Sequence, residues 1–310
     1  MKLINPSHEI WEQDVSGKPL RGIITSPETM HESLLQGIYK QIERAGRICY
    51  KSEDKITDDS AETFVQRMVD SQHYAMLEHG TVYLAIPCAD YKSSEDFMLS
   101  YGSNPYTKWD ASDCNWDTKE GHIYVTTNYR VIIENHWEDD LECLCVPCAK
   151  HPRRATVHLT CNRQVTHELV RHRTMSFAQE STRYCNYTKG KFGSELTFIR
   201  PNWLTAEPVL LEDPVYAEAK AKLVWALETA ESAYFSLIKA NWKPQHAATV
   251  LPNALKAEIV VTGFIDDWKH VFRLRTRIAA TGKPHPQMEE LINPLLDEFI
   301  RRGYIDTNFC

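Results

Sequence analysis

Three features that would direct a protein to a membrane, to the secretory pathway or to nucleic acid are missing from this sequence. No apolar run approaches the ~18 residues needed to span a bilayer. The first residues, Met1 to Pro6, lack the apolar core of a signal peptide. The formal net charge is -7, whereas general nucleic-acid binding favours a basic balance. We therefore expect a cytoplasmic protein without nucleic-acid or membrane partners, whose basic clusters bind small anions.

Short-period repeats and low-complexity tracts are also missing. The 310 residues suffice for one large domain or two, and 43% apolar with 25% charged residues is typical of a globular protein. Nine cysteines without a secretion signal indicate free thiols in a reducing compartment.

Helical patterns occupy both ends of the chain, and short strands lie between them. Pro27, preceded by Ser26 as a cap, begins one helix, and Asp59 begins a second with a capping-box pattern. The remaining expected elements are strands at 81–86, 155–161 and 196–199, and helices at 162–173, after Asp213-Pro214, after Pro244, over 268–277 and from Pro286 to Arg302. This order predicts an α+β fold with a mixed α/β core and a helical C-terminal third.

Residues 87–154 have a different composition. Ser, Asn, Asp and Trp are frequent there, and only 122–127 and 131–133 look regular. We interpret this segment as an elaboration inserted into a single domain that spans residues 1–310. Its Cys143, Cys145 and Cys148, with His151 just beyond, can be read as zinc ligands or as small packed side chains. Because zinc sites usually use paired cysteine spacings, we expect no metal.

The segment from Arg171 to Tyr184 concentrates hydrogen-bond donors. Its fourteen residues contain three arginines, a histidine and four aliphatic hydroxyls, but one carboxylate. The apolar positions follow neither a helical nor a strand period for long. Such a segment suits a ligand with several anionic oxygens, such as a nucleotide phosphate or a flavin pyrophosphate. The alternative is a basic surface loop.

Two flanking helices carry further candidates. On the helix expected at 162–173, Glu168, Arg171 and His172 would share one face, either as a site or as a simple salt bridge. On the helix at 268–277, histidine and arginines would lie at the edges of a buried stripe, either as ligand contacts or as a solvated basic face.

The spacing Arg171-His172-Arg173, seven residues, Ser181, then Arg183-Tyr184 resembles the signature of the flavin-dependent thymidylate synthases. Similar matches are Cys49 after an Ala-x-Arg-x run and the pair His73 and Glu78. Matches nearer the C-terminus are Leu274-Arg275 and His285-Pro286-Gln287. The resemblance runs from about Ala45 to Gln287, and residues 87–154 look like an insertion relative to short members.

The resemblance implies a methyltransferase that converts dUMP to dTMP in nucleotide biosynthesis. It implies FAD as cofactor, with NADPH as reductant and methylenetetrahydrofolate as carbon donor. It also implies a homotetramer with a mixed α/β core and active sites at subunit interfaces. The positions that match flavin contacts are His73, Glu78, Arg171, His172, Arg173 and His270. The positions that match nucleotide contacts are Glu168, Gln179, Ser181, Thr182, Arg183 and Arg275.

Residue chemistry assigns roles within this set. Arg275 is the candidate catalytic residue, since a fixed guanidinium stabilises negative charge on a uracil carbonyl. Arg183 and Ser181 would hold the nucleotide phosphate. Ser181 is not assigned as a nucleophile, because no activating His/Asp pair is evident.

Two departures from the pattern of the flavin-dependent thymidylate synthases keep other hypotheses about the function open. Ala248 stands where members commonly carry a phosphate-binding arginine, with His246 or Lys256 as possible substitutes. Phe264 and Asp266 replace the Asn-x-Arg flavin contacts. Ala248 suggests an enzyme that modifies another pyrimidine nucleotide. Phe264 and Asp266 suggest a non-catalytic flavin- or nucleotide-binding protein.

Overall fold

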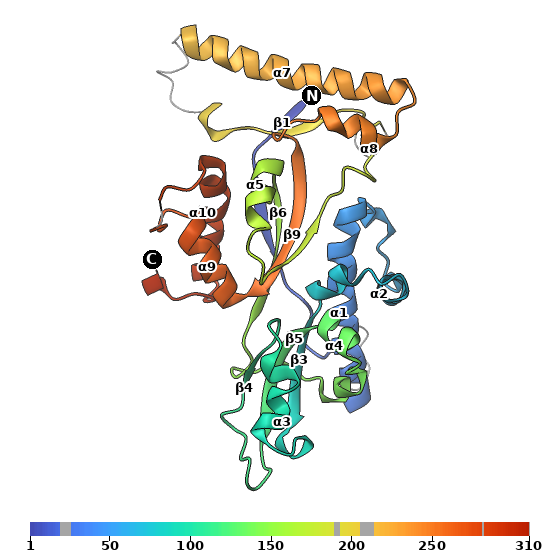
Figure 1. The fold of residues 1–310 in the computed structure, drawn as a ribbon, viewed down its shortest axis with the longest axis vertical. Helices are drawn as coiled ribbons and strands as arrows, with labels where there is room; N and C mark the ends of the chain where they lie inside the picture. Colours follow the sequence, from blue (N-terminus) through green and yellow to red (C-terminus); the bar gives the residue numbers. More distant parts are fainter. Residues whose placement is uncertain (19–25, 189–192, 205–213, 281, 310) are drawn as a thin grey trace.

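The computed structural model of the chain describes residues 1–18, 26–188, 193–204, 214–280 and 282–309. Three layers follow one another along the longest axis in Figure 1. Helix α7 (Pro214–Lys239) lies across one end, a four-stranded sheet lies in the middle, and a three-stranded sheet lies at the other end.

The middle sheet is antiparallel throughout. Its strands, in spatial order, are β2 (Ser7–Trp11), β6 (Arg154–Asn162), β9 (Lys256–Phe264) and β7 (Ser176–Gln179). Helices α9 (Ile265–Arg275) and α10 (Pro286–Arg301) pack against it, and Val157, Val261, Trp268 and Phe299 form part of their common core. This core positions α9, whose last turn carries Arg275.

The three-stranded sheet packs against the N-terminal helices. Its strands are β3 (Thr81–Pro87), β5 (His122–Asn128) and β4 (Lys108–Asp110), and the helices are α1 (Pro27–Tyr50) and α2 (Ser60–Asp70). Ile42, Phe64, Leu84 and Val125 belong to one buried cluster. The segment 87–154 therefore shares a core with the N-terminal helices.

A smaller layer lies at the α7 end. Strands β1 (Lys2–Ile4) and β8 (Thr197–Ile199) pair in parallel, and α8 (Pro244–Ala247) lies beside α7. Phe198, Leu227, Tyr234 and Leu255 form its core. The other helices among the described residues are α3 (Ser94–Met98), α4 (Tyr129–Asn135) and α5 (Arg163–Leu169). Short 3-10 helices lie at Glu53–Lys55, Tyr74–His79, Cys88–Asp90, Tyr101–Ser103, Glu138–Cys143, Asn202–Leu204, Ala248–Val250 and Thr307–Phe309.

The mixed α/β fold and several predicted elements are confirmed. Ser26 caps α1, and its side chain accepts a hydrogen bond from the Thr29 amide at 3.3 Å. The strands expected at 81–86, 155–161 and 196–199 and the helix beginning at Pro286 are present within a few residues. Asp213, expected to cap α7, lies outside the described residues.

Strand β9 is the largest error in the predicted secondary structure. It interrupts a C-terminal third that is otherwise mainly helical, as expected. The strand lies between β6 and β7, and from Ile259 to Phe264 every residue is buried. A strand that is buried on both faces shows no polar–apolar alternation, so its pattern resembles a buried helix. Strands β1 and β2 were not predicted either.

Two smaller expectations are wrong. Asp59 makes no capping hydrogen bond to α2; instead the Ser60 hydroxyl accepts from the Thr57 amide and donates to Glu43. Cys88 and Cys114 are not free thiols but form a disulfide.

Across the residues that the structure describes, every helix is too short or too polar to cross a bilayer.

Candidate active site

Helix α5 brings the first part of the donor-rich segment to the sheet. The Asn162 side chain accepts a hydrogen bond from the Val165 amide at 2.8 Å and begins the helix. Val165 and Leu169 are buried, as predicted. The helix ends at Leu169, however, so the predicted continuation to residue 173 is wrong. The chain must turn at this point to enter β7, and the shared helix face for Glu168, Arg171 and His172 therefore does not exist.

Four predicted site residues nevertheless lie together. We call Glu168, His172, His270 and Arg275 the active-site cluster. Arg275, on the last turn of α9, donates from Nη1 to Glu168 Oε2 at 2.7 Å. The rings of His172 and His270 lie with their centroids 5.7 Å apart. The structure thus joins the end of α5 to α9 across 107 residues of sequence.

Two buried nitrogens of this cluster have no hydrogen-bond partner within the described part of the chain. They are His172 Nε2 and Arg275 Nε. Burial, followed by the charges of Arg275 and His270, lowers the pKa of His172 to about 4. The imidazole is therefore neutral at physiological pH. A buried polar atom without a partner costs about 1–3 kcal/mol, which a bound ligand with polar atoms would offset.

Arg171 and Arg173 extend from the turn after α5. Both side chains are exposed, and no carboxylate among the residues described here lies within ion-pair distance of either one. Thr174 anchors the turn by donating to Asp267 Oδ1 at 2.9 Å. The two guanidinium groups are thus held next to the active-site cluster without internal counter-ions.

The second half of the donor-rich segment begins as strand β7, where no strand was predicted. Gln179 donates to Thr166 Oγ1 at 3.1 Å, so its amide faces α5. The Ser181 amide donates to the Cys49 carbonyl at 3.1 Å. The Ser181 hydroxyl accepts from the Arg183 amide at 3.3 Å, and its surroundings contain no hydrogen-bonded histidine. Thr182 is half-buried.

Arg183 is exposed and lies over the Tyr184 ring at 5.6 Å. The Tyr184 ring is 5.4 Å from the Tyr50 ring. Tyr50 in turn contacts His73 Nδ1 through its hydroxyl at 3.0 Å. His73 therefore lies near the end of the segment and away from the active-site cluster.

Glu78 pairs with Arg130 of the segment 87–154 at 2.6 Å. Within one chain, the predicted flavin contacts thus fall into separate groups. His172 and His270 lie in the active-site cluster, His73 lies beside Tyr50, and Glu78 lies beside α4.

The part of the chain that holds most of these residues matches a known family. A family model described as thymidylate synthase complementing protein matches residues 151–301. This part of the chain is therefore similar to the thymidylate synthase complementing protein family.

Curated relatives and solved structures give the extent of the similarity. A flavin-dependent thymidylate synthase of Pyrococcus furiosus is 36% identical over 145 residues, which are 47% of this chain and 53% of the relative. One from Corynebacterium aurimucosum is 31% identical over 136 residues, 42% of this chain and 51% of the relative. The chain thus spans about half the length of the curated relatives it matches. A Streptomyces cacaoi UMP/dUMP methylase bound with 5-Br dUMP shows 16% identity and a TM-score of 0.41, covering 98% of this chain and 92% of that chain.

At the positions where the chain departs from the thymidylate synthase complementing protein family, the substituted residues have structural partners. Phe264 is 5% exposed and lies beneath Lys108 and Arg154. Asp266 pairs with Lys108 at 2.8 Å and with Lys269 at 3.2 Å. The described contacts therefore account for both residues without a ligand.

Lys256, considered above as a substitute for the missing arginine at Ala248, is already paired. Its Nζ lies 2.9 Å from Glu180 Oε2 and 2.6 Å from Glu258 Oε1. His246 is exposed, and its side chain contacts Gln245. Neither residue therefore provides an unpaired buried cation in place of the arginine.

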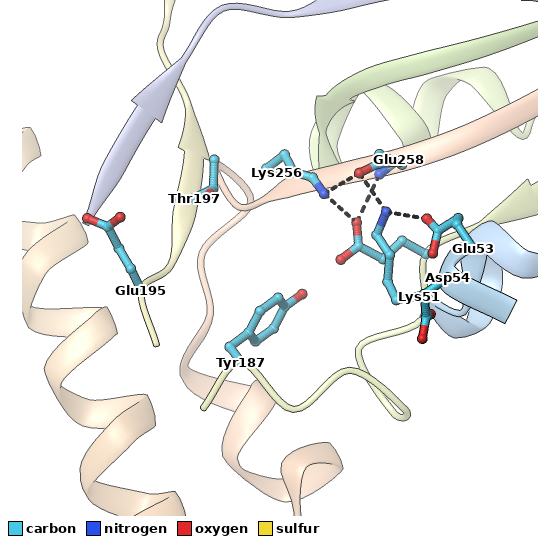
Figure 2. Close-up of a pocket in the computed structure, with 9 residues that line it drawn as sticks. Lys51, Glu53, Asp54, Tyr187, Glu195, Thr197, Lys256 and Glu258 are labelled. Atoms are coloured by element: carbon cyan, nitrogen blue, oxygen red, sulfur yellow. Dashed lines mark hydrogen bonds and ion pairs between the residues drawn. The ribbon is translucent and has the colours of Figure 1, made fainter. Parts of the chain in front are cut away.

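Lys256 belongs to a set of buried and half-buried charges that sequence reasoning missed. We call Lys51, His158, Glu180, Lys256 and Glu258 the lysine–carboxylate network; Figure 2 shows both lysines directed at Glu258. Lys51 and His158 lie 2.7 and 3.0 Å from Glu258. Burial would raise the pKa of Glu258, but the His158 hydrogen bond and the charges of Lys256 and Lys51 lower it strongly. The sequence signal that could have pointed to this network is Glu180, the single carboxylate of the donor-rich segment.

The network lines one side of a cavity of about 470 Å³. Tyr187 and Thr197 lie on the other side, with Glu53, Asp54 and Glu195 nearby. Carboxylates outnumber lysines in the lining, so the cavity does not favour a phosphate.

The cysteines of residues 143–148 do not gather around one point. Cys145 and Cys148 contact opposite nitrogens of His151, at 3.6 and 3.4 Å. Over the described residues, no group of three or more potential ligands is arranged to hold a metal ion.

Proposed function

We propose that the chain is a flavin-dependent thymidylate synthase, a methyltransferase that converts dUMP to dTMP. The observation that carries this proposal is the active-site cluster within the family region. It combines a guanidinium held by Glu168 with two buried nitrogens that lack partners. The proposed co-substrates are methylenetetrahydrofolate as carbon donor and NADPH as reductant, with FAD as cofactor, in the cytoplasm.

The donor set fits a flavin with its pyrophosphate. Arg171 and Arg173 provide exposed cations without internal counter-ions, and His172 and His270 provide neighbouring rings. His73 and Glu78 would complete the site. Bound FAD would supply the hydride chemistry that protein side chains lack. The protein binds and orients the flavin and excludes water around it.

The nucleotide would lie beside β7 and α9. Arg275 would stabilise negative charge on the uracil carbonyl, and Glu168 would hold the guanidinium in position. Gln179, Ser181, Thr182 and Arg183 would bind the sugar and phosphate. The position of Ser181, with its amide bound to Cys49 and its hydroxyl bound to Arg183, suits binding rather than nucleophilic attack.

The contacts of His73 and Glu78 within one chain favour active sites shared between subunits. His73 and Glu78 have partners of their own and none in the active-site cluster. We propose that one chain supplies the cluster and a neighbour supplies residues such as His73, in a homotetramer of single-domain chains. The segment 87–154 would then be an insertion in that domain, with Arg130 tying it to Glu78.

The second candidate function is methylation of another pyrimidine nucleotide. Ala248 removes the usual phosphate arginine, and the substitute Lys256 is neutralised by Glu180 and Glu258. A changed phosphate site can accompany a changed nucleotide. The third possibility is a flavin- or nucleotide-binding protein without turnover, suggested by Phe264 and Asp266.

One experiment separates these functions. The purified protein is reconstituted with FAD, and NADPH oxidation is followed with methylenetetrahydrofolate and either dUMP, UMP or dCMP. The methylated product is identified by mass spectrometry. We expect dTMP from dUMP, with the other nucleotides much slower.

Each other outcome assigns a different function. Methylation of UMP or dCMP in preference to dUMP supports the second function. Flavin absorbance that responds to nucleotide without any methylated product supports a binding protein. Failure of dUMP to alter the flavin spectrum or to yield dTMP contradicts the leading proposal.

A further inference from the structure

The segment 145–148, with the sequence Cys-Val-Pro-Cys, places two sulfurs around one imidazole. Cys148 Sγ lies 3.4 Å from His151 Nδ1, and Cys145 Sγ lies 3.6 Å from Nε2. The His151 side chain is buried and packs edge-on against two tyrosine rings, at 5.4 and 5.3 Å. Its orientation relative to the two thiols is therefore fixed.

The hydrogen bonds of His151 determine which nitrogen carries the proton. Nε2 lies 3.1 Å from the Leu84 carbonyl, which can only accept, so Nε2 carries the hydrogen. Nδ1 is then the acceptor, and it receives the Cys148 amide at 3.1 Å. Its lone pair also lies next to the Cys148 thiol. His151 Nδ1 is thus a base within reach of that thiol's proton.

The two cysteines differ in accessibility. Cys148 is exposed, whereas Cys145 is half-buried and lies 3.7 Å from the Tyr83 carbonyl. Burial, followed by nearby Cys148 and Cys143, raises the pKa of Cys145 to about 12. In redox-active Cys-x-x-Cys pairs, the accessible thiol reacts first and the protected thiol completes the disulfide.

Cys148 also lines a cavity of about 370 Å³ that the proposed synthase reaction does not use. Small-molecule sites commonly have about 300–1,000 Å³. Tyr83 contributes an aromatic wall, and Arg153 and Arg154 contribute cations. The lining carboxylate, Glu12, is engaged by Arg302 at 2.7 Å and by Tyr304 at 2.5 Å.

Neither arginine of this cavity has an ion-pair partner in the described ranges. Arg154 donates to Thr81 Oγ1 at 3.1 Å and to the Glu78 carbonyl at 3.0 Å, and both acceptors are neutral. Burial lowers the pKa of Arg154 to about 10, so it stays charged at neutral pH. A half-buried cation without an ion-paired carboxylate favours an anionic ligand.

We propose that residues 145–148 form a redox-active dithiol that exchanges with a small disulfide bearing carboxylates, such as oxidised glutathione, bound by Arg153 and Arg154. Cys148 gives its proton to His151 Nδ1 and attacks one sulfur of the ligand disulfide. This forms a mixed disulfide and releases one glutathione thiolate. Cys145 gives its proton to the released glutathione thiolate, attacks the Cys148 sulfur and closes the Cys145–Cys148 disulfide. The second glutathione leaves as a thiolate and takes the proton held on His151 Nδ1. Both cysteines are oxidised, and one disulfide is reduced to two thiols.

The test uses the full chain, reduced, desalted and exposed to oxidised glutathione, followed by acid quenching and peptide mass spectrometry. Wild type should accumulate the Cys145–Cys148 disulfide. Cys145→Ser should accumulate glutathione on Cys148, since the second step is blocked. His151→Gln should react about tenfold more slowly at neutral pH, with the difference lost at alkaline pH where the thiolate forms without a base. Cys143→Ser is the matched control and should behave as wild type.

The cavity is tested separately with Arg153→Gln. This variant should need several-fold more oxidised glutathione for the same rate but should react normally with uncharged hydroxyethyl disulfide. An equal loss with both reagents contradicts carboxylate binding in the cavity. A Cys145→Ser chain that carries no glutathione on Cys148, or labelling of Cys49 as fast as Cys148, overturns the dithiol proposal. None of these readouts depends on thymidylate synthesis.

Discussion

Two polar groups, one largely on the middle sheet and one on and next to helices α5 and α9, differ in how completely their buried atoms are paired. The lysine–carboxylate network has no buried side-chain atom without a hydrogen bond. The active-site cluster has two, at His172 and Arg275. Both groups combine carboxylates, cations and histidine, so residue types alone do not separate them. Complete pairing indicates a structural role for the network, whereas unsatisfied atoms indicate that the cluster binds a ligand.

Removing a lysine from the network should give the largest effect. Lys256→Ala removes the ion-pair partner of Glu180, which is 2% exposed, and leaves the charge of Lys51 as its compensation. We expect a loss of roughly 3–5 kcal/mol in the free energy of unfolding, measured by urea denaturation, because a buried carboxylate loses its ion-pair partner. Lys269→Ala is the control. Its partner Asp266 is 66% exposed, so the loss should stay below about 1 kcal/mol. Equal losses in the two variants would show that the network does not stabilise the fold.

Removing the guanidinium of the cluster should instead affect turnover. We expect Arg275→Ala to lower kcat for dTMP formation by about 100- to 1,000-fold, the effect of deleting one group that stabilises a developing anion. The free energy of unfolding should change less than in Lys256→Ala. Arg273→Ala on the same helix is the control, since Arg273 lies over Phe309 and outside the cluster. Near wild-type turnover for Arg275→Ala would remove the uracil-polarising role.

Substitution of Arg183 tests whether the exposed donors of the donor-rich segment bind the substrate. Losing one charge-assisted contact costs about 1.5–3 kcal/mol, so Arg183→Ala should raise KM for dUMP roughly 10- to 100-fold. The value of kcat and the KM for NADPH should change little, because the contact is made to the phosphate throughout the reaction. An unchanged KM for dUMP would exclude Arg183 from the phosphate site.

Sequence reasoning identified the donor-rich segment better than the network, for a physical reason. Arg171, His172, Arg173, Ser181 and Arg183 lie within one short segment, so their chemistry is visible without the fold. The contact of Glu168 with Arg275 depends on tertiary structure; the resemblance to a known family named both residues but not their contact with each other. The network was missed because Lys256 and Glu258 lie on β9, the strand that was not predicted, and Lys256 was considered only as a substitute for the missing arginine.

Two errors in the local structure of the donor-rich segment had a common origin. Strand β7 and the early end of α5 both follow from pairing with β9, since the chain must turn after Leu169 to reach it. Local propensity does not contain this constraint. Elements with their own capping signals, such as α1 after Ser26 and α10 after His285, were predictable because the signal lies in adjacent residues.

Protonation of His172 at acid pH should give the smallest effect on the free energy of unfolding. It distinguishes the active-site cluster from the lysine–carboxylate network by the pH at which stability is lost. The pKa of His172 is about 4 in the folded protein and near its ordinary 6.5 when unfolded. Below pH 6.5 the unfolded chain therefore binds a proton that the folded chain does not. Stability should fall as the pH drops from 6.5 towards 4, by on the order of 1 kcal/mol over the first pH unit. The network behaves differently, because the lowered pKa of Glu258 causes loss of stability only below its unfolded value of 4.5.

Substitution of His172 should therefore reduce the pH dependence of the free energy of unfolding in one pH range. His79, fully buried and with its pKa lowered to about 3 by burial, titrates in the same direction and would remain. In urea denaturation at a series of pH values, His172→Gln should show a smaller slope than wild type between pH 6.5 and 4 and nearly the same slope below about pH 3. An unchanged slope in the upper range would mean that His172 is already protonated in the folded protein. The buried Nε2 would then carry a hydrogen, and a bound ligand would have to provide an acceptor at this point.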